Sequence, residues 1–281
     1  MLYKFKKMNI LITGANGFIA SNIIKRLELN NTNIIFKATK SSLNLYSLYD
    51  VRKFITDNQI ESIIHCAIEG GKRLTVDDKN IVYNNILMVQ NLLACRIKGL
   101  FINIASGAEF DRNLDINNIK ETEIYNRIPT DYYGFSKNVI SKLINTIPNG
   151  INLRLFGCFD KNEHITRMIR SNLNNYILKK PMIIHQDKYM DFVYIDDLCN
   201  LIVNILNESL KQIKDINVVY NKKYKLSDIT NIINNLDNYK VPILIESTKL
   251  GLSYSGDGTI FNNLNVNYKG LEFGIKECYT T

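Results

Sequence analysis

Residues 8–20 of the chain read MNILITGANGFIA, a short apolar run followed by a glycine-punctuated turn and the start of an amphipathic segment. The apolar run has the length of a buried parallel strand. Gly14 and Gly17 follow at the spacing of a dinucleotide-binding turn, in which the first glycine turns the chain and the second lets the backbone approach a pyrophosphate. Ala20 stands where a third glycine is usual. A lone glycine turn is also found in plain strand-to-helix connections. The rest of the chain must therefore decide whether this turn binds a dinucleotide.

Composition places the chain among ordinary folded proteins. It has 281 residues, 46% of them apolar and 22% charged, which suits one large domain or slightly more. The basic and apolar start is similar to a signal peptide, but its apolar run stops at the glycine turn, so we predict a first strand there. No run approaches the length of a membrane span. The five cysteines are scattered without a CxxC pair, which favours a cytoplasmic location and gives no support for a metal site.

The formal charge of +8 raises the question of whether the protein binds nucleic acid. The lysines are spread along the chain and mixed with asparagine rather than clustered, so a nucleic-acid surface is not expected. The milder inference is a general attraction for anionic small molecules such as nucleotides.

Apolar periodicity alternates between strand and helix over the first 156 residues. The expected strands are 10–12, 34–39, 62–66, 99–105 and 151–156, and the expected helices are 18–29, 47–57, 77–96 and 131–146. This rhythm predicts an α/β fold of the Rossmann type, with a doubly wound parallel sheet. Beyond Phe159 the rhythm loosens. Apolar runs at 182–184 and 241–245, with helices near 226–236 and 270–279, predict a smaller C-terminal α/β lobe.

The end of the second strand bears on the choice of cofactor. NAD-binding enzymes usually place an acidic residue there to hold the ribose 2′-hydroxyl. This chain instead reads KATKSS over residues 37–42, with no carboxylate until Asp50. A cation and hydroxyls suit a 2′-phosphate, so Lys40 and Ser41 favour NADP. The alternative is that Lys37 and Lys40 are solvated surface lysines.

Two further features predict proton-transfer chemistry. Tyr133 and Lys137 are four residues apart and therefore share one face of the helix after the fourth strand, where an ammonium favours a nearby phenolate. Ser106 ends the fourth strand, and that edge of an open α/β sheet faces the ligand crevice. The plainer interpretation of Tyr133 and Lys137 is a pair of side chains on a helix surface. The plainer interpretation of Ser106 is a serine that caps the end of a strand.

Taken together, the motifs resemble the extended short-chain dehydrogenase/reductase family that acts on nucleotide sugars. The resemblance covers essentially the whole chain and rests on TGANGFIA, His65-Cys66-Ala67, Asn85, Asn91, Ser106 with Phe110, Tyr133 with Lys137, Arg154-Leu155-Phe156-Gly157 and the segment Asp191 to Asp197. The stretches KATKSSLNL and HCAIEGG are most similar to the GDP-fucose synthase branch, which uses NADPH to reduce a 4-keto-6-deoxy sugar nucleotide.

The resemblance implies a division of the chain and a set of roles. It implies an NADP-binding Rossmann domain over 1–160 with a return segment near 188–215, which includes Asp191 to Asp197, and a substrate lobe over 161–187 and 216–281. Helices on either side of strand four often pair subunits in this family, which implies a homodimer. The residues expected to bind the cofactor are Gly14, Asn16, Gly17, Phe18, Ile19, Lys40, Ser41, Ala67, Asn85 and Lys137. Ser106, Tyr133 and Lys137 are expected to be catalytic.

Departures from the family pattern narrow the expected reaction. Family dehydratases carry an Asp-Glu pair where this chain has Gly107 and Ala108, which argues against sugar dehydration. GDP-fucose synthase uses a cysteine at the position of Ala108, together with a histidine that His164 matches, to epimerise C3 and C5. Without the cysteine, reduction without epimerisation is favoured. Met190 replaces an arginine that helps to hold the substrate pyrophosphate.

These inferences predict an NADPH-dependent ketoreductase acting on a nucleotide-linked sugar. Tyr133 would protonate the developing alkoxide, Ser106 would hydrogen-bond the same oxygen, and Lys137 would bind the nicotinamide ribose. His164, Arg167, Arg170 and Lys188 are the candidate substrate-binding residues. Two alternatives stay open: an NAD-dependent nucleotide-sugar epimerase or bifunctional epimerase-reductase, and a non-catalytic NADP-binding regulator.

Overall fold

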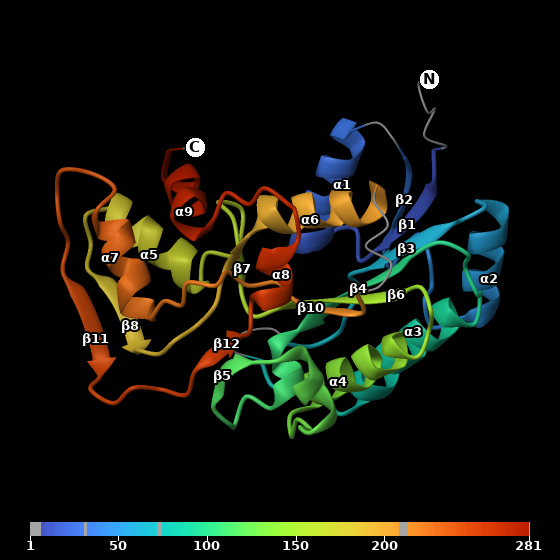
Figure 1. Ribbon diagram of the computed structural model, residues 1–281, viewed down its shortest axis with the longest axis horizontal. Helices are drawn as coiled ribbons and strands as arrows, with labels where there is room; N and C mark the ends of the chain where they lie inside the picture. The colour runs from blue at the N-terminus through green and yellow to red at the C-terminus, as the bar shows by residue number, and fades with distance from the viewer. Residues whose placement is uncertain (1–6, 31–32, 72–74, 208–212, 281) are drawn as a thin grey trace. The chain divides into compact units, whose positions relative to one another are not determined.

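A computed structural model describes residues 7–30, 33–71, 75–207 and 213–280 (Figure 1). The first six residues of the leader-like start lie outside that part, and the first strand begins at Asn9. The chain divides into two compact units. The first comprises residues 1–111, 122–154 and 202–216, and the second comprises residues 112–121, 155–201 and 217–281.

The first unit is an α/β layer structure. In chain order its elements are β1 (Asn9–Thr13), α1 (Phe18–Asn30), β2 (Ile34–Ala38), α2 (Leu48–Asp57), β3 (Ser62–His65), α3 (Asn80–Leu93), β4 (Phe101–Ser106), the 3₁₀ helices η1 (Gly107–Phe110) and η2 (Glu121–Tyr125), α4 (Tyr132–Asn145), β6 (Gly150–Leu155) and β10 (Asp215–Asn217). Among the described residues, six strands form one sheet in the order β10-β6-β4-β3-β1-β2. The pairs β1–β2, β1–β3 and β3–β4 are parallel, which confirms the predicted Rossmann-type sheet.

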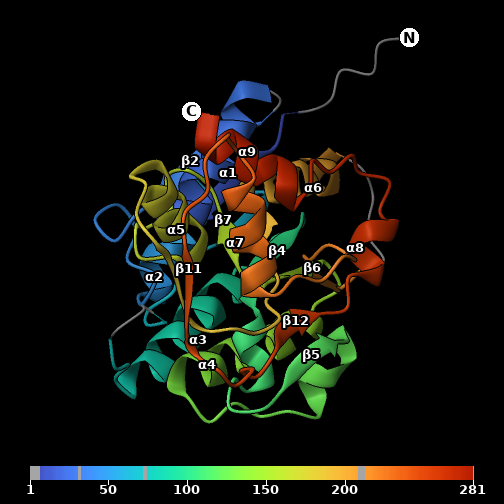
Figure 2. The same ribbon diagram turned by 90° about the vertical axis from the view of Figure 1, so that its left-hand side faces the viewer.

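One face of this sheet is covered by α2, α3 and α4, and α1 lies on the other face (Figure 1). Both views show α3 and α4 side by side (Figure 2). The core on the three-helix face joins apolar side chains of the sheet to those of the helices: Leu11, Ile63, Phe101, Val51, Ile55, Met88, Val89, Leu92, Ile140 and Ile144. Burial of these side chains holds the carboxyl ends of β1, β3 and β4 at one edge.

Side-chain caps set the starts of α2 and α4 close to the expected ones. The Ser47 side chain accepts a hydrogen bond from the backbone N–H of Asp50 and starts α2. The Asp131 side chain accepts one from Gly134 and starts α4 in the same way. These two caps explain why the apolar pattern predicted both helices well.

The long helix expected over 77–96 is shorter at both ends. The carboxylate of Asp77 accepts hydrogen bonds from the Gly71 backbone, and that of Asp78 accepts one from Asn80, so these residues form a loop before α3. At the other end Arg96 has a φ of 48°, which a right-handed helix cannot include. Within the apolar run over 241–245 a strand begins only at Ile243, because Pro242 lacks an N–H and Val241 bonds to the Asn234 side chain.

The second unit contains short paired strands and helices. Its elements are β5 (Ile116–Ile119), β7 (Cys158–Phe159), α5 (Met168–Ile177), β8 (Met182–Gln186), β9 (Val193–Tyr194), α6 (Ile195–Asn207), α7 (Leu226–Asn234), β11 (Ile243–Ser247), β12 (Tyr254–Gly256), α8 (Thr259–Asn263) and α9 (Leu271–Thr280). The pairs β8–β11, β5–β12 and β7–β9 are parallel. Helices α5 and α7 pack beside β8. The boundary between the units falls inside α6, after Leu201.

Within the described ranges, no helix has the length and hydropathy that a membrane crossing requires. None of the five cysteines, all of which lie in those ranges, forms a disulfide.

Candidate active site

The glycine turn after β1 forms a cradle of backbone. Gly14 has a φ of 66°, and a Cβ placed on it would stand 2.9 Å from the backbone N and Cα of Ala67. The N–H of Gly17 donates to the Gly14 carbonyl at 2.8 Å, and a Cβ on Gly17 would lie 3.1 Å from that oxygen. The absence of side chains at both positions lets the turn pack this closely before α1 begins at Phe18. The shape is compatible with the dinucleotide pyrophosphate that the spacing predicts, and that role stays a prediction.

A buried pair under the turn joins β1 to β3. The Thr13 hydroxyl oxygen accepts hydrogen bonds from the backbone N–H groups of Cys66 and Ala67, and it lies 2.9 Å from Nδ1 of His65. Because both acceptor sites of the hydroxyl are used, its hydrogen points to Nδ1, so the His65 proton is on Nε2. Burial, together with the charge of Lys137, lowers the pKa of His65 to about 3. The histidine is therefore neutral and structural.

Above the turn lies a cavity of about 750 Å³. Its walls include six of the predicted cofactor-binding residues, Gly14, Asn16, Gly17, Lys40, Ser41 and Ala67, together with Ala38, Thr39, Leu43, Asn44, Leu45, Tyr46, Cys66, Ile68, Glu69 and Met88. Apolar walls beside a few polar groups suit an adenosine moiety. Phe18 and Ile19 form the first residues of α1 and do not line this cavity.

Lys40 and the carboxylate of Glu69 contact each other in the wall of this cavity. The Lys40 ammonium lies 3.1 Å from Oε1 of Glu69, and the Tyr46 hydroxyl donates to the same oxygen at 2.7 Å. Asn84 donates to the other carboxylate oxygen at 2.8 Å, and these hydrogen bonds lower the pKa of Glu69. Lys37 instead pairs with Glu28 at 2.7 Å, so Lys40 is the cavity lysine.

Asn85 is a positioning residue rather than a wall of the cavity. Its carbonyl oxygen accepts the Glu69 backbone N–H at 2.8 Å, and its amide donates to the Glu69 carbonyl at 3.0 Å and to Ser136 at 3.1 Å. The side chain is fully buried. It fixes the segment after β3 and thereby the place of Glu69.

Helix α4 carries the predicted proton-transfer pair. Lys137 is 4% exposed, and its ammonium donates to the Ile104 carbonyl on β4 at 2.6 Å. Burial lowers the pKa of Lys137 to about 8, and the Glu109 carboxylate and Cys66 oppose that shift. Tyr133 is half-buried one turn earlier, where the backbone of Gly71 approaches its ring so closely that a Cβ on Gly71 would stand 2.6 Å away.

Ser106 ends β4 at the same edge. Its hydroxyl oxygen accepts a hydrogen bond from the Ala108 backbone N–H at 3.2 Å, and its own backbone N–H donates to Oε1 of Glu109 at 2.8 Å. The hydroxyl can therefore still donate its hydrogen to another acceptor. Ser106 can therefore cap the end of the strand through its hydroxyl oxygen and still offer its hydroxyl hydrogen to a substrate, as both interpretations require.

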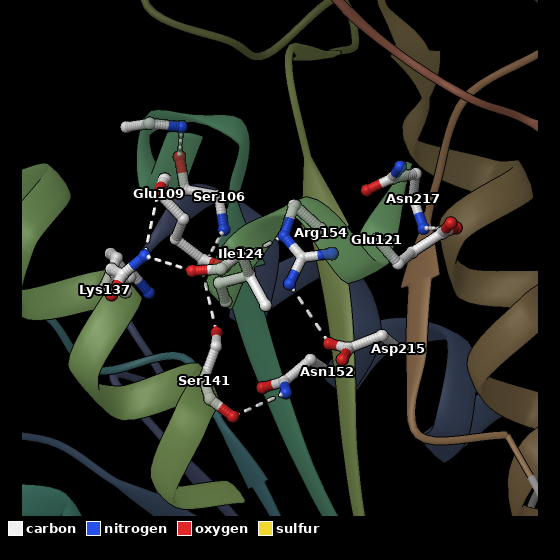
Figure 3. Close-up of polar contacts among 12 residues, drawn as sticks. Ser106, Glu109, Glu121, Ile124, Lys137, Ser141, Asn152, Arg154, Asp215 and Asn217 are labelled. Atoms are coloured by element: carbon white, nitrogen blue, oxygen red, sulfur yellow. Dashed lines mark hydrogen bonds and ion pairs between the residues drawn. The ribbon is translucent and has the colours of Figure 1, made fainter. Parts of the chain in front are cut away.

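Behind Ser106 lies a buried ionic network (Figure 3). Glu109 accepts from Nε of Arg154 at 2.8 Å and from the Ser141 hydroxyl at 2.9 Å. The Arg154 guanidinium also bonds Asp215 at 3.1 Å. Glu109 and Arg154 are both fully buried. Three elements, η1, α4 and β6, are thus tied together by charge directly behind the serine.

The four candidate substrate residues all belong to the second unit. His164 is exposed and bonds the Thr166 hydroxyl at 2.8 Å. Arg167 precedes α5 with its Nε 3.9 Å from Glu163, and Arg170 lies in the first turn of that helix. Lys188 lies in a separate loop, over the Tyr254 ring. Burial and the charge of Arg112 lower the pKa of Lys188.

Two site residues were not found from the sequence. Glu69 reaches the loop after β2 from the segment after β3, a tertiary contact without a local signal. Glu109 had such a signal, because Ser106-x-x-Glu109 matches the capping-box pattern that the structure forms here.

The chain is 22% identical over 266 residues to the GDP-L-colitose synthase of Yersinia pseudotuberculosis, covering 86% of each protein. It is also 22% identical over 249 residues to the GDP-6-deoxy-D-talose 4-dehydrogenase of Aggregatibacter actinomycetemcomitans, covering 84% of this chain and 82% of that one.

Solved structures share the fold. A GDP-mannoheptose C4 reductase from Campylobacter jejuni with NADP bound superposes with a TM-score of 0.84 over 98% of both chains at 16% identity. A GDP-L-fucose synthetase from Naegleria fowleri bound to NADP gives 0.77 at 14% identity, over 98% of this chain and 92% of the other. The family model described as "NAD dependent epimerase/dehydratase family" matches residues 10–219. The family resemblance is thereby confirmed, and the chain belongs to the NAD dependent epimerase/dehydratase family.

Proposed function

We propose that this protein reduces a keto group on a nucleotide-linked 4-keto-6-deoxy sugar with NADPH, without epimerising it. The observation that carries the proposal is the Lys137 ammonium, buried against the β4 backbone one turn after Tyr133 and at the same sheet edge as Ser106. A regulator that only senses a dinucleotide has no need of a proton donor with a buried cation beside it. The relatives named above, GDP-L-colitose synthase and GDP-6-deoxy-D-talose 4-dehydrogenase, support a GDP-linked sugar.

The residues of this chain have separate roles in the proposal. The nicotinamide cofactor, when bound, supplies the hydride. Tyr133 donates its phenolic proton to the developing alkoxide, and the Lys137 ammonium stabilises the phenolate that remains. Ser106 donates a hydrogen bond to the same substrate oxygen. The cradle at Gly14 and Gly17 would hold the pyrophosphate, and Lys40 with Ser41 would face the adenosine ribose.

Substrate screening and one substitution test the proposal together. The purified protein is mixed with NADPH and GDP-, CDP-, UDP- or dTDP-linked 4-keto-6-deoxy sugars made in situ, and NADPH oxidation is followed. Tyr133→Phe should lower turnover by about 10²–10⁴ with NADPH binding intact. The matched control is Tyr132→Phe, which changes the neighbouring exposed tyrosine and should turn over normally. Wild-type turnover by Tyr133→Phe would contradict the acid–base assignment.

An NAD-dependent epimerase is the second candidate, and Glu69 is the observation that favours it. NAD sites use a carboxylate to hold ribose hydroxyls, and Glu69 brings one into the cavity. An epimerase keeps its cofactor bound through turnover. Protein that retains NAD through dialysis would support this candidate over the reductase.

A homodimer is proposed as well. Helices α3 and α4 pack on each other and carry exposed aromatic side chains, Tyr83 on α3 and Tyr132 and Phe135 on α4. Sedimentation equilibrium measures the mass directly, and a monomer at micromolar concentration would contradict the pairing.

A further inference from the structure

The buried carboxylate of Glu109 has no role in the proposed proton transfer, yet it bonds the backbone of Ser106 and its charge acts on Lys137, two residues that have one. It is 0% exposed. Burying a charged carboxylate is costly unless donors replace its water. The groups that donate hydrogen bonds to Glu109, and the site residues to which they connect it, therefore indicate its function.

Its first link leads to Ser106. Oε1 of Glu109 accepts the Ser106 backbone N–H at 2.8 Å, while the Ser106 hydroxyl accepts from Ala108. These two bonds close the 3₁₀ helix η1 onto the end of β4 and fix the backbone from which the serine hydroxyl projects. The carboxylate thus sets the position of that hydroxyl.

Its second link is electrostatic and leads to Lys137. Desolvation lowers the pKa of this lysine, whereas the negative charge of Glu109 raises it. The other groups that act on Lys137 are Cys66, which raises its pKa, and His65, with which it interacts from β3. His65 is neutral, so Glu109 is the buried anion on this side of the ammonium.

The donors of Glu109 keep it in the charged form. Nε of Arg154 and the backbone N–H of Ser106 are groups that can only donate, and the guanidinium is cationic. Burial raises the pKa of Glu109, and the charges of Arg154 and Lys137 together with the Ser106 hydrogen bond oppose that rise. Asp215 shares the Arg154 guanidinium from β10, so the network holds two carboxylates and two cations.

We propose that Glu109 is a positioning residue for the reaction: its carboxylate anchors the backbone of Ser106 and, bonded to Ser141 one turn after Lys137 on α4, supplies the negative charge that acts on the Lys137 ammonium. The proposal rests on the proposed function for its kinetic consequence only. Loss of the charge would leave desolvation of the buried Lys137 less opposed, and the lysine would lose its proton at a lower pH.

The direct test follows Lys137 itself, in protein without cofactor or substrate. Lysine labelled with ¹³C at Cε is incorporated, and the Lys137 signal is assigned by its absence in Lys137→Arg. The wild-type signal should titrate near pH 8. Glu109→Gln, which keeps the shape and removes the charge, should lower that midpoint by about one pH unit or more. The matched control is Ser141→Ala, which removes another partner of the same carboxylate but keeps its charge and should leave the midpoint in place.

The kinetic test uses the same variants. Activity should fall at alkaline pH as Lys137 loses its proton, and Glu109→Gln should move that fall to lower pH by the same amount as the resonance. Glu109→Asp keeps the charge but withdraws it from Ser106. This variant should lower kcat by about tenfold and leave the pH at which activity falls unchanged. That variant also decides the matter if Glu109→Gln fails to fold, since wild-type kcat in Glu109→Asp would overturn the proposal.

The outcomes separate this inference from the proposed function. A Lys137 midpoint that is equal in wild type and Glu109→Gln, or that moves as far in Ser141→Ala, would overturn the role of Glu109 whatever the reaction. A shifted midpoint in a protein that oxidises no NADPH with any sugar nucleotide would support the link between Glu109 and Lys137 and contradict the reductase instead.

Discussion

The Oγ1 atom of Thr13, which directly precedes the glycine cradle at Gly14, lies 2.9 Å from Nδ1 of His65. This contact makes the histidine a neutral acceptor. Its buried Nε2 carries the proton and has no hydrogen-bond partner among the described residues, so a second proton, on Nδ1, would create a buried charge that no acceptor at Nε2 offsets. The cradle is therefore built on a group that resists protonation.

This contact predicts a pH dependence of stability. The folded pKa of about 3 lies below the ordinary value of 6.5, so the stabilisation is present above pH 6.5 and is lost as pH falls toward 3. At pH 5.5 the loss from this residue should be about 1.4 kcal/mol relative to neutral pH. Urea unfolding between pH 7 and 5 measures it. His65→Asn, whose amide oxygen replaces Nδ1 as acceptor, should flatten the dependence, whereas His164→Asn, at an exposed histidine, should not. An unchanged slope in His65→Asn would contradict the argument.

Gly71 gives a second prediction, because its backbone supports the Tyr133 ring. A Cβ there would lie 2.6–2.9 Å from three ring atoms, and the residue has a φ of 68°. Gly71→Ala should cost about 1 kcal/mol of stability from the backbone strain and should also displace the ring and lower kcat. Gly270→Ala is matched in strain, since Gly270 has a φ of 88° with nothing within 4 Å of the added carbon. It should destabilise equally and leave kcat unchanged. Equal kcat in the two variants would show that Gly71 does not support the tyrosine.

Cofactor choice should depend on the pair between Lys40 and Glu69. A charge-assisted bond from Lys40 to a 2′-phosphate should favour NADPH over NADH by about tenfold or more, and Lys40→Ala should erode that preference. Lys40 is 86% exposed, so its pair with Glu69 is weak and can open. Glu69→Gln removes the competing carboxylate and should tighten NADPH binding by about threefold or more while leaving NADH little changed. Calorimetric titration measures both cofactors, with Lys37→Ala as the control lysine. Equal NADPH and NADH affinity in wild type would contradict the NADP assignment.

The parts of the fold that were predictable are those that local chemistry controls. The glycine turn and the helices that begin near Ser47 and Asp131 each lie within one short stretch, so local sequence patterns were sufficient to find them. Helix α6 was not recognised as a helix, although Leu198, Leu201, Ile202 and Ile205 recur at helical spacing and are buried. Its segment had been interpreted through the Asp191 to Asp197 motif, and its membership of both units follows from tertiary contacts alone.

The candidate site likewise has a part that was predictable from local sequence and a part that depends on tertiary contacts. Tyr133 and Lys137 share a helix face by spacing, so the pair was predictable, but the contact of Lys137 with the Ile104 carbonyl depends on how α4 packs on β4. Glu69 and Lys40 are 29 residues apart, and Glu109 and Arg154 are 45 apart. No local pattern reports which of the many carboxylates will meet a given cation once the strands are ordered, so neither ion pair was predictable, although the capping-box pattern at Ser106 marked Glu109 itself.

The last prediction concerns the reaction outcome and depends on Ala108. Epimerisation requires one group that removes a proton from the carbon beside the ketone and another that returns one to the opposite face. The methyl group of Ala108 can do neither, and it is 1% exposed in η1, directly after Ser106 and Gly107. Reduction in D₂O with NADPH and a 4-keto sugar nucleotide should therefore give a product without carbon-bound deuterium at C3 or C5 beyond a control without enzyme, as measured by NMR and mass spectrometry. His164→Asn should leave this result unchanged, because no epimerisation is expected that would require this histidine. Enzyme-dependent deuterium at either carbon would reveal a proton-abstracting group in this chain and would assign the protein to the bifunctional epimerase-reductases.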